Sequence, residues 1–166
     1  MLSQQINIDE IDKEIIHIIQ KDPNITHTDI AKRVERSQPT IGLRIRKLQE
    51  AGVINFQAGL NLRVANVMIA QVRIKTKNPK KILDKVKECP FMLNGFRLSG
   101  ENNVIILIAN SSIKHLDEII NTHFRKDEEV QDVKMDIITD VIKDFVLPFD
   151  INEEDCDCGL KFSAPF

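Results

Sequence analysis

The side chains with the clearest chemical capacity lie close together between positions 37 and 50, and they suit recognition better than a reaction. Amide, hydroxyl and guanidinium groups hydrogen-bond to the edges of base pairs in the major groove of DNA, and an outward leucine can pack on a thymine methyl group. We therefore treat this stretch as a candidate surface for contact with double-stranded DNA. Its candidate residues are Gln38, Thr40, Leu43, Arg44, Arg46 and Lys47.

The stretch from 37 to 54 has the features of a single helix that presents these side chains. Ser37 is a good N-cap, Pro39 is tolerated in the first turn, and Gly52 suits the left-handed residue that ends a helix. An apolar stripe at helical spacing should face a core, with the candidate contacts opposite it or on its flanks. The members of the stripe are Ile41, Ile45 and Leu48. Taken alone, the pattern also fits an ordinary solvated amphipathic helix.

Two further helices precede this one and decide between those readings. Apolar residues at helical spacing and an acidic first turn predict a helix from Asp9 to Gln20. Thr26 and Asp29 have the spacing of a capping box and open a second, short helix, which only residues 35–36 separate from Ser37. Two short helices joined by so tight a turn, with the second one basic, predict a helix-turn-helix. The alternation at 53–57 favours a wing strand after it.

The hydrophobic period changes after a predicted hinge at residues 58–66. Alternating and apolar runs predict four strands, and two helical segments separate them in the order β-α-β-β-α-β. The predicted strands cover residues 67–74, 91–99, 104–109 and 130–147, and the helices begin at Asn78 and at Ser111 or Ser112. This order is that of a ferredoxin-like domain. The predicted fold class is therefore α+β, with a winged helix-turn-helix domain ahead of the sheet domain.

Only two helices are predicted to cover this sheet, yet its strands have apolar residues for two faces. The run VIILIA at 104–109 is apolar throughout, as expected of a central strand covered on both sides. Val67 and Ile69 extend the second apolar face. We therefore expect a second subunit to cover that face. Ile69→Asp should then bury a charge at the interface and produce monomers or aggregates.

Charge is distributed unevenly along the 166 residues, whose formal net charge is −2. Residues 25–50 contain six basic and three acidic residues, and residues 51–100 contain nine and two. Local positive charge attracts phosphates, so the acidic total does not exclude DNA. The lysines at 77–87 are equally well explained as a solvated helix face. No signal peptide or membrane-length apolar run is evident, which predicts a cytoplasmic protein with no membrane partner.

The sequence resembles the Lrp/AsnC family of bacterial and archaeal transcription regulators over residues 6–147. The blocks that carry the resemblance are IDEIDKEIIHIIQKDPNIT, IAKRV and SQPTIGLRIRKLQEAGVI, and the strand order matches the family's second domain. The resemblance implies a homodimer, often assembled further into octamers, that binds pseudo-palindromic promoter DNA as an activator or repressor and acts on the transcription machinery. It divides the chain into a DNA-binding domain at 1–57, a hinge at 58–66, an effector and oligomerisation domain at 67–149, and an acidic tail at 150–166.

The resemblance also implies an effector site at the turn formed by Gly100, Glu101, Asn102 and Asn103. Family members that sense amino acids usually have a Gly-Asp-aromatic-Asp-like sequence there. In this chain the aromatic residue is missing and an Asn replaces the second acid, so a charged α-amino group would lose one opposite charge. Such a loss costs on the order of 1.5–3 kcal/mol, so we expect a weak response or none to simple amino acids.

Two other functional classes fit parts of the sequence. A sensor or partner module without DNA binding would keep the second domain, but the basic third helix argues against it. A sirohaem decarboxylase of similar architecture would need a haem-sized pocket with placed His, Arg or Tyr. The chain has no Tyr, and His115 and His123 would lie roughly 12 Å apart along one helix. We therefore expect no enzymatic activity, no cofactor and no resident metal.

The tail at 150–166 contains two cysteines, Cys156 and Cys158, with one residue between them. They could form a redox dithiol or half of a metal site. Two ligands do not close a zinc site, and a reducing cytoplasm disfavours a disulfide. The alternative is an acidic tail in which the two cysteines have no such role, and the sequence favours that alternative.

Overall fold

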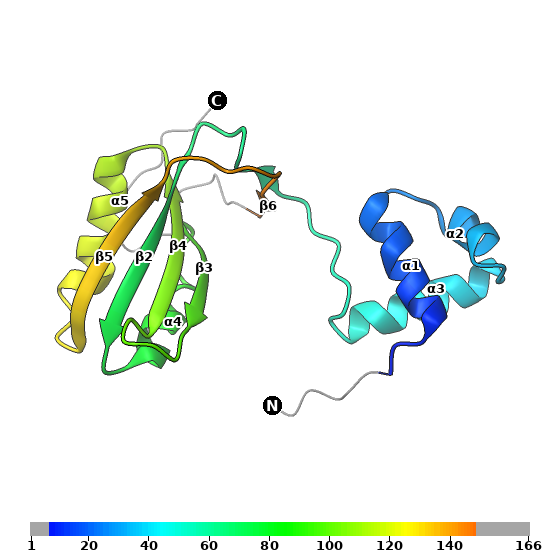
Figure 1. Ribbon diagram of the computed structural model, residues 1–166, viewed down its shortest axis with the longest axis horizontal. Helices are drawn as coiled ribbons and strands as arrows, with labels where there is room; N and C mark the ends of the chain where they lie inside the picture. Colours follow the sequence, from blue (N-terminus) through cyan, green and yellow to red (C-terminus); the bar gives the residue numbers. More distant parts are fainter. Residues whose placement is uncertain (1–6, 149–166) are drawn as a thin grey trace. The chain divides into compact units, whose positions relative to one another are not determined.

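The computed structural model describes residues 7–148, which form two compact units with their boundary in the chain between Gln57 and Ala58 (Figure 1). The first unit is helical, and the second is built on an antiparallel sheet. Each unit has its own hydrophobic core. Among the described residues no helix is long and apolar enough to cross a membrane.

The first unit consists of three helices whose starts are fixed by polar side chains. They are α1 Glu10–Lys21, α2 His27–Arg33 and α3 Gln38–Glu50. Asp9 forms a capping box with Asp12 at the start of α1, and the hydroxyls of Thr26 and Ser37 cap α2 and α3. These helices confirm the predicted helix-turn-helix.

Apolar residues on the facing sides of the three helices form the core of this unit, as their helical spacing predicts. The buried members of the cluster are Ile15, Ile18, Ile19, Ile30, Ala31, Val34, Ile41 and Ile45. Leu48 is buried as well, so all three members of the predicted stripe on α3 face inward. The opposite side of α3 is thereby left in solvent.

Two left-handed residues shape the ends of α3. Gly52, with φ of +70°, ends the helix as predicted, and Glu35, with φ of +52°, lies in the turn before it. A non-glycine residue in this region is strained because its Cβ approaches the following carbonyl oxygen. Residues 53–58 form no hydrogen-bonded strand within the described part of the chain, although the alternation at 53–57 favours a wing strand. No described neighbour supplies the hydrogen-bonding partner that a strand needs.

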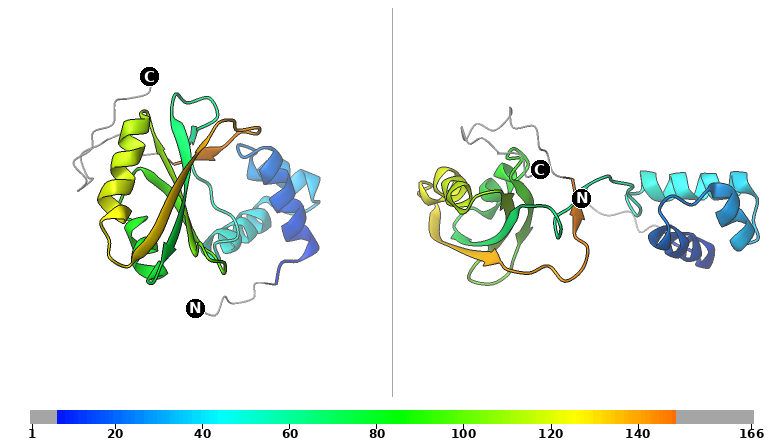
Figure 2. Two further views of the ribbon diagram at one scale, coloured as in Figure 1. Left: turned by 60° about the vertical axis from the view of Figure 1, so that its left-hand side comes forward. Right: turned by 90° about the horizontal axis from the view of Figure 1, so that it is seen from above.

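The second unit is a four-stranded antiparallel sheet with the order β3-β4-β2-β5. Its elements are β2 Met68–Thr76, α4 Pro79–Lys85, β3 Met92–Arg97, β4 Val104–Asn110, α5 Ile113–Ile120, the π-helical turn η1 Asn121–Arg125, and β5 Val130–Ile138. The strands twist relative to one another across the sheet (Figure 2). This arrangement confirms the predicted β-α-β-β-α-β order and the ferredoxin-like fold.

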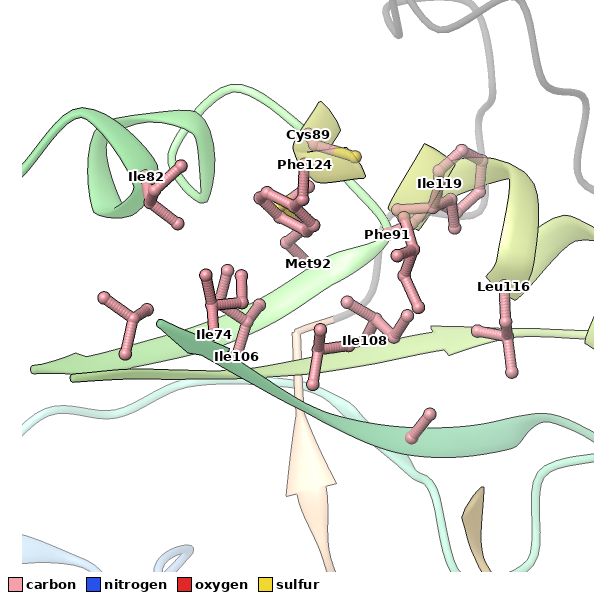
Figure 3. Packing of buried hydrophobic residues seen from close by; sticks show 14 residues of the cluster. Ile74, Ile82, Cys89, Phe91, Met92, Ile106, Ile108, Leu116, Ile119 and Phe124 are labelled. Atoms are coloured by element: carbon pink, nitrogen blue, oxygen red, sulfur yellow. The ribbon is translucent and has the colours of Figure 1, made fainter. Parts of the chain in front are cut away.

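One face of the sheet packs against both helices. Ile74, Ile106 and Ile108 point from β2 and β4 toward the helices (Figure 3). Ile82 of α4 and Leu116 of α5 are fully buried over them. Burial of a side chain of this size contributes about 1.5–3 kcal/mol, so this face supplies most of the unit's apolar stabilisation.

The last predicted strand, at 130–147, is two strands in the structure. β5 ends at Ile138, which pairs with Ile69, the second residue of β2, so a longer strand would have only Met68 of β2 left to pair with. The chain then crosses the other face of the sheet, and β6 Val146–Leu147 pairs with β1 Leu60–Asn61. Part of the expected hinge at 58–66 is therefore a strand.

This crossing also corrects the expectation for Ile69. That side chain is only 3% exposed, and the cluster that buries it contains Leu62 and Ala109, with Val141 and Phe145 packed against them from the same chain. A Cβ at Gly59 would lie 2.4 Å from the backbone of Leu147, so glycine is what lets these two segments approach. Ile69→Asp would thus disturb the subunit's own core and would not report on a partner.

Candidate functional site

The side of α3 opposite its core stripe is open to solvent. Arg46 and Lys47 lie on it and are exposed, Leu43 there is 68% exposed, which is high for a leucine, and Gln38 is exposed on its flank in the first turn. We call these four residues the outer face of α3. No ion pair joins Arg46 or Lys47 to another described residue. This face combines one amide, two cations and one apolar side chain within three helical turns.

Thr40 contributes to the same end of the helix in a different way. Its hydroxyl oxygen lies 2.7 Å from the Ser37 hydroxyl oxygen, and its backbone N–H donates to that hydroxyl at 3.4 Å. Thr40 is half-buried, so its first role is to hold the N-cap. Its hydroxyl retains one further hydrogen-bonding position toward solvent.

Arg44 occupies a position that sequence reasoning did not anticipate. Its Nη1 donates to carboxylate oxygens of both Asp9 and Asp12, each at 2.7 Å. These carboxylates form the capping box of α1, so Arg44 joins the start of α1 to the middle of α3. The hydrogen bonds to Asp12 and Asp9 raise the pKa of Arg44. The Asp12 backbone N–H and then Arg44 lower the pKa of Asp9.

Three further basic residues lie just ahead of α3 and were not singled out from the sequence. Lys32 and Arg33 end α2, and Arg36 lies in the turn, where all three are exposed. Lys32 is 3.5 Å from Asp29, and Arg36 Nη1 donates to the Glu35 carbonyl oxygen at 2.9 Å. The excess of basic residues at 25–50 was the available signal, but only the fold shows that they lie on the solvent side.

The turn after β3 is held to the end of β2 by one amide side chain. Asn103 Nδ2 donates to the Thr76 carbonyl oxygen at 2.7 Å, and its Oδ1 accepts from the Thr76 N–H at 3.1 Å. Glu101 pairs with Lys75 at 2.7 Å, and that hydrogen bond lowers the pKa of Glu101. Hydrogen bonds to Thr76 and Lys75 of β2 therefore fix the turn in place.

A solvent-open hollow of about 580 Å³ lies beside this turn. Its lining residues are Pro79, Arg97, Leu98, Ser99, Gly100 and Asn103. The hollow thus includes Gly100 and Asn103 of the four predicted effector residues, whereas Glu101 and Asn102 do not line it. Arg97 was not predicted from the sequence, because no motif distinguishes it from other surface arginines.

The histidines and acids of residues 7–148 form no group of three that could hold a metal ion. His115 Nδ1 lies 3.1 Å from the Asn110 side-chain oxygen. Partial burial lowers the pKa of His123, whose ring packs 6.1 Å from that of Phe124. Both histidines therefore contact neighbouring side chains of the second unit. Cys156 and Cys158 lie outside the described residues.

Two protein families match consecutive parts of the chain. Residues 8–55 match the winged helix-turn-helix DNA-binding family, and residues 67–147 match the Lrp/AsnC ligand binding domain. The first match ends at residue 55 and the second begins at residue 67. The boundary between the two structural units, after Gln57, lies between them.

Individual relatives match this chain along nearly their whole length. The leucine-responsive regulatory protein of Rhizobium meliloti is 26% identical over 147 residues, which cover 84% of this chain and 94% of the relative. The HTH-type transcriptional regulator LrpA of Pyrococcus horikoshii is 28% identical over 140 residues, covering 82% and 99%. The structure of E. coli AsnC superposes with a TM-score of 0.72 at 18% identity, covering 84% of this chain and 99% of that one.

Proposed function

Because the chain belongs to the Lrp/AsnC family of DNA-binding transcription regulators, we propose that the outer face of α3 enters the major groove of its DNA site. The chain is a regulator with a ligand-binding domain and not an enzyme. The observation that carries the proposal is that Leu43, Arg46 and Lys47 are exposed on one capped helix and that neither cation has an ion-pair partner in the described chain.

Each contact residue has a distinct role in this proposal. Gln38 and Thr40 near the N-terminus of α3 hydrogen-bond to base edges, and Leu43 packs on a thymine methyl group. Arg46 reads a base or a phosphate, and Lys47 neutralises a phosphate. Arg44 acts as a positioning residue that fixes α3 against α1 and makes no base contact of its own.

We also propose that the DNA-binding form is a homodimer built through the part of the second sheet face that residues 141–147 do not cover. Phe96 and Ile105 are cross-strand partners on that face, and Leu107 follows two residues along β4. Ile105 and Leu107 are only half-buried within one subunit, and Phe96 is 45% exposed. These residues form an apolar patch on β3 and β4, beside the polar Gln71 and Arg73 of β2, and such a patch favours pairing with a second copy. Octamers would add a further interface.

A dimer explains why one helix suffices in each subunit. One recognition helix reads a half-site, so two subunits related by a twofold axis select a pseudo-palindrome. Its half-sites should lie about one helical turn, or a multiple of it, apart. The ligand-binding domain would then couple an effector at the Gly100–Asn103 turn to the spacing or stability of this assembly.

The DNA-contact proposal is tested by selecting sites from a random duplex library with the full chain and then measuring affinity by fluorescence anisotropy over a salt series. Lys47→Ala should weaken selected and unselected duplexes alike and reduce the salt slope by about 1. Arg46→Ala should weaken binding by roughly 1–3 kcal/mol if it reads a base. Lys114→Ala is the matched control, because Lys114 is 82% exposed on α5 in the other unit. Unchanged affinity in both α3 variants would remove α3 from the interface.

The dimer proposal is tested by light scattering at micromolar concentration. Leu107→Asp should convert dimers to monomers, because it places a charge at the centre of the proposed interface without entering the core against α4 and α5. Retention of the unfolding midpoint would show that the subunit itself is intact. A wild-type monomer, or a Leu107→Asp dimer, would contradict the proposal.

A further inference from the structure

The hollow beside the Gly100–Asn103 turn contains a cation that no described carboxylate neutralises. Arg97, the last residue of β3, lines it and is exposed to solvent. No ion pair or side-chain hydrogen bond joins Arg97 to any residue in 7–148. An anion that enters from solution can therefore reach the guanidinium without displacing an existing partner.

The carboxylate nearest in sequence is already engaged. Glu101 Oε1 accepts from Lys75 Nζ at 2.7 Å, and Glu101 does not line the hollow. An α-ammonium group in the hollow would find no uncommitted carboxylate among the lining residues, all of which are neutral except Arg97. The site thus offers no charge to hold an amino acid's nitrogen.

The one amide side chain in the lining, that of Asn103, already makes hydrogen bonds within the protein. Asn103 uses its Oδ1 and its Nδ2 on the two backbone groups of Thr76, at 3.1 and 2.7 Å. In addition, the Leu98 N–H donates to the Asn103 carbonyl oxygen at 2.9 Å. These bonds fix the wall of the hollow and occupy one acceptor position of the Asn103 side-chain oxygen, which has no formal charge to hold a ligand ammonium.

The surroundings add positive charge and a small apolar surface. The segments 75–80 and 97–103 contain four basic residues and one acidic residue. Pro79 and Leu98 line the hollow with apolar atoms beside the guanidinium. We propose that the hollow binds a small carboxylate with a short apolar chain and no α-ammonium group, such as a 2-oxo acid, with Arg97 holding the carboxylate through paired N–H groups. This inference rests on the proposed effector role of the turn and names the chemical class of the effector.

The test compares two probes with the same carbon skeleton, 4-methyl-2-oxopentanoate and leucine, by calorimetric titration into the full chain. The oxo acid should bind at least tenfold more tightly than leucine. Arg97→Gln should weaken its binding at least tenfold with an unchanged unfolding midpoint, and Arg97→Lys should restore part of the loss. Lys114→Gln removes one exposed charge from α5 and should leave binding unchanged.

Several results would overturn the inference. They are leucine binding as tightly as the oxo acid, no binding of either probe at millimolar concentration, or an Arg97→Gln variant that binds like the wild type. Inorganic phosphate that matches the oxo acid with the same dependence on Arg97 would reduce the site to a general anion site and would also overturn it. DNA affinity without ligand is measured on the same preparations. Protein that binds DNA but not the oxo acid refutes only the ligand class, and the reverse pattern refutes only the proposed function.

Discussion

Replacing Arg44 separates a positioning role from a DNA contact. The Asp12 side chain is 12% exposed and that of Arg44 is 28% exposed, so their 2.7 Å bond is partly shielded from water. A hydrogen bond to a charged group contributes about 1.5–3 kcal/mol, and exposure reduces that figure. We therefore expect Arg44→Ala to lower the local free energy of unfolding of α1 and α3 by about 1–2 kcal/mol. Lys47→Ala, an exposed change on the same helix, should stay within about 0.5 kcal/mol.

Native-state hydrogen exchange of the α1 and α3 amides measures this local free energy directly. A double-mutant cycle with Asp12→Asn isolates the pair, because asparagine can still accept from the Asp9 N–H at the capping box. The coupling free energy between the two substitutions should be about 1 kcal/mol or more.

Measuring the affinity for DNA distinguishes the positioning role of Arg44 from a direct DNA contact. If Arg44 positions α3, Arg44→Ala and Asp12→Asn should weaken binding in the same direction, since the first removes both bonds from α3 to the start of α1 and the second weakens one of them. If Arg44 contacts DNA, Asp12→Asn leaves its guanidinium held by Asp9 alone and should leave affinity equal or higher. A coupling free energy near zero, together with that second pattern, would refute the positioning role.

Two further predictions concern stability. Glu35→Gly should raise the free energy of unfolding by up to about 1 kcal/mol in urea denaturation, because glycine relieves the left-handed strain at the turn, whereas Glu35→Gln should give no gain. Asp127 accepts from Lys81 at 3.0 Å and from Lys85 at 3.1 Å, and these bonds, that of Lys81 foremost, lower its pKa from 3.8 to about 2. A lowered pKa stabilises the fold above the unfolded value, so Asp127→Asn should cost about 1–2 kcal/mol at neutral pH, and the difference should vanish as the pH falls from about 4 to 2.

Features encoded by neighbours in the chain were predictable from the sequence. The stripe of Ile41, Ile45 and Leu48, the Ser37 cap and the Gly52 stop all lie within a single helix and its ends, and the structure has each of them. The order of strands and helices in the second unit followed in the same way from changes in hydrophobic period. These signals act over a few residues, where spacing alone determines which side chains share a face.

Features that depend on distant segments were not predictable. Arg44 meets Asp12 across 32 positions, and nothing local distinguishes a basic residue held by another helix from one that faces solvent. Ile69 reads as an interface residue until the return of residues 141–147 over it is known. Likewise β5 ends at Ile138 because β2 has only Met68 left beyond Ile69, and where β2 begins is a property of the partner strand.

The ion pairs of Arg44 reduce the number of cations that the helix-turn-helix unit can offer to DNA phosphates. Residues 25–50 contain six basic residues, but the carboxylates of Asp9 and Asp12 occupy one of them. The exposed remainder consists of Lys32, Arg33, Arg36, Arg46 and Lys47. At a slope of about 0.9 per neutralised phosphate, these five cations can produce a salt dependence of at most about 4.5, instead of about 5.4 for all six. A steeper measured slope per subunit would therefore require cations outside residues 25–50, and Lys21 and the lysines at 77–87 would be the first to replace.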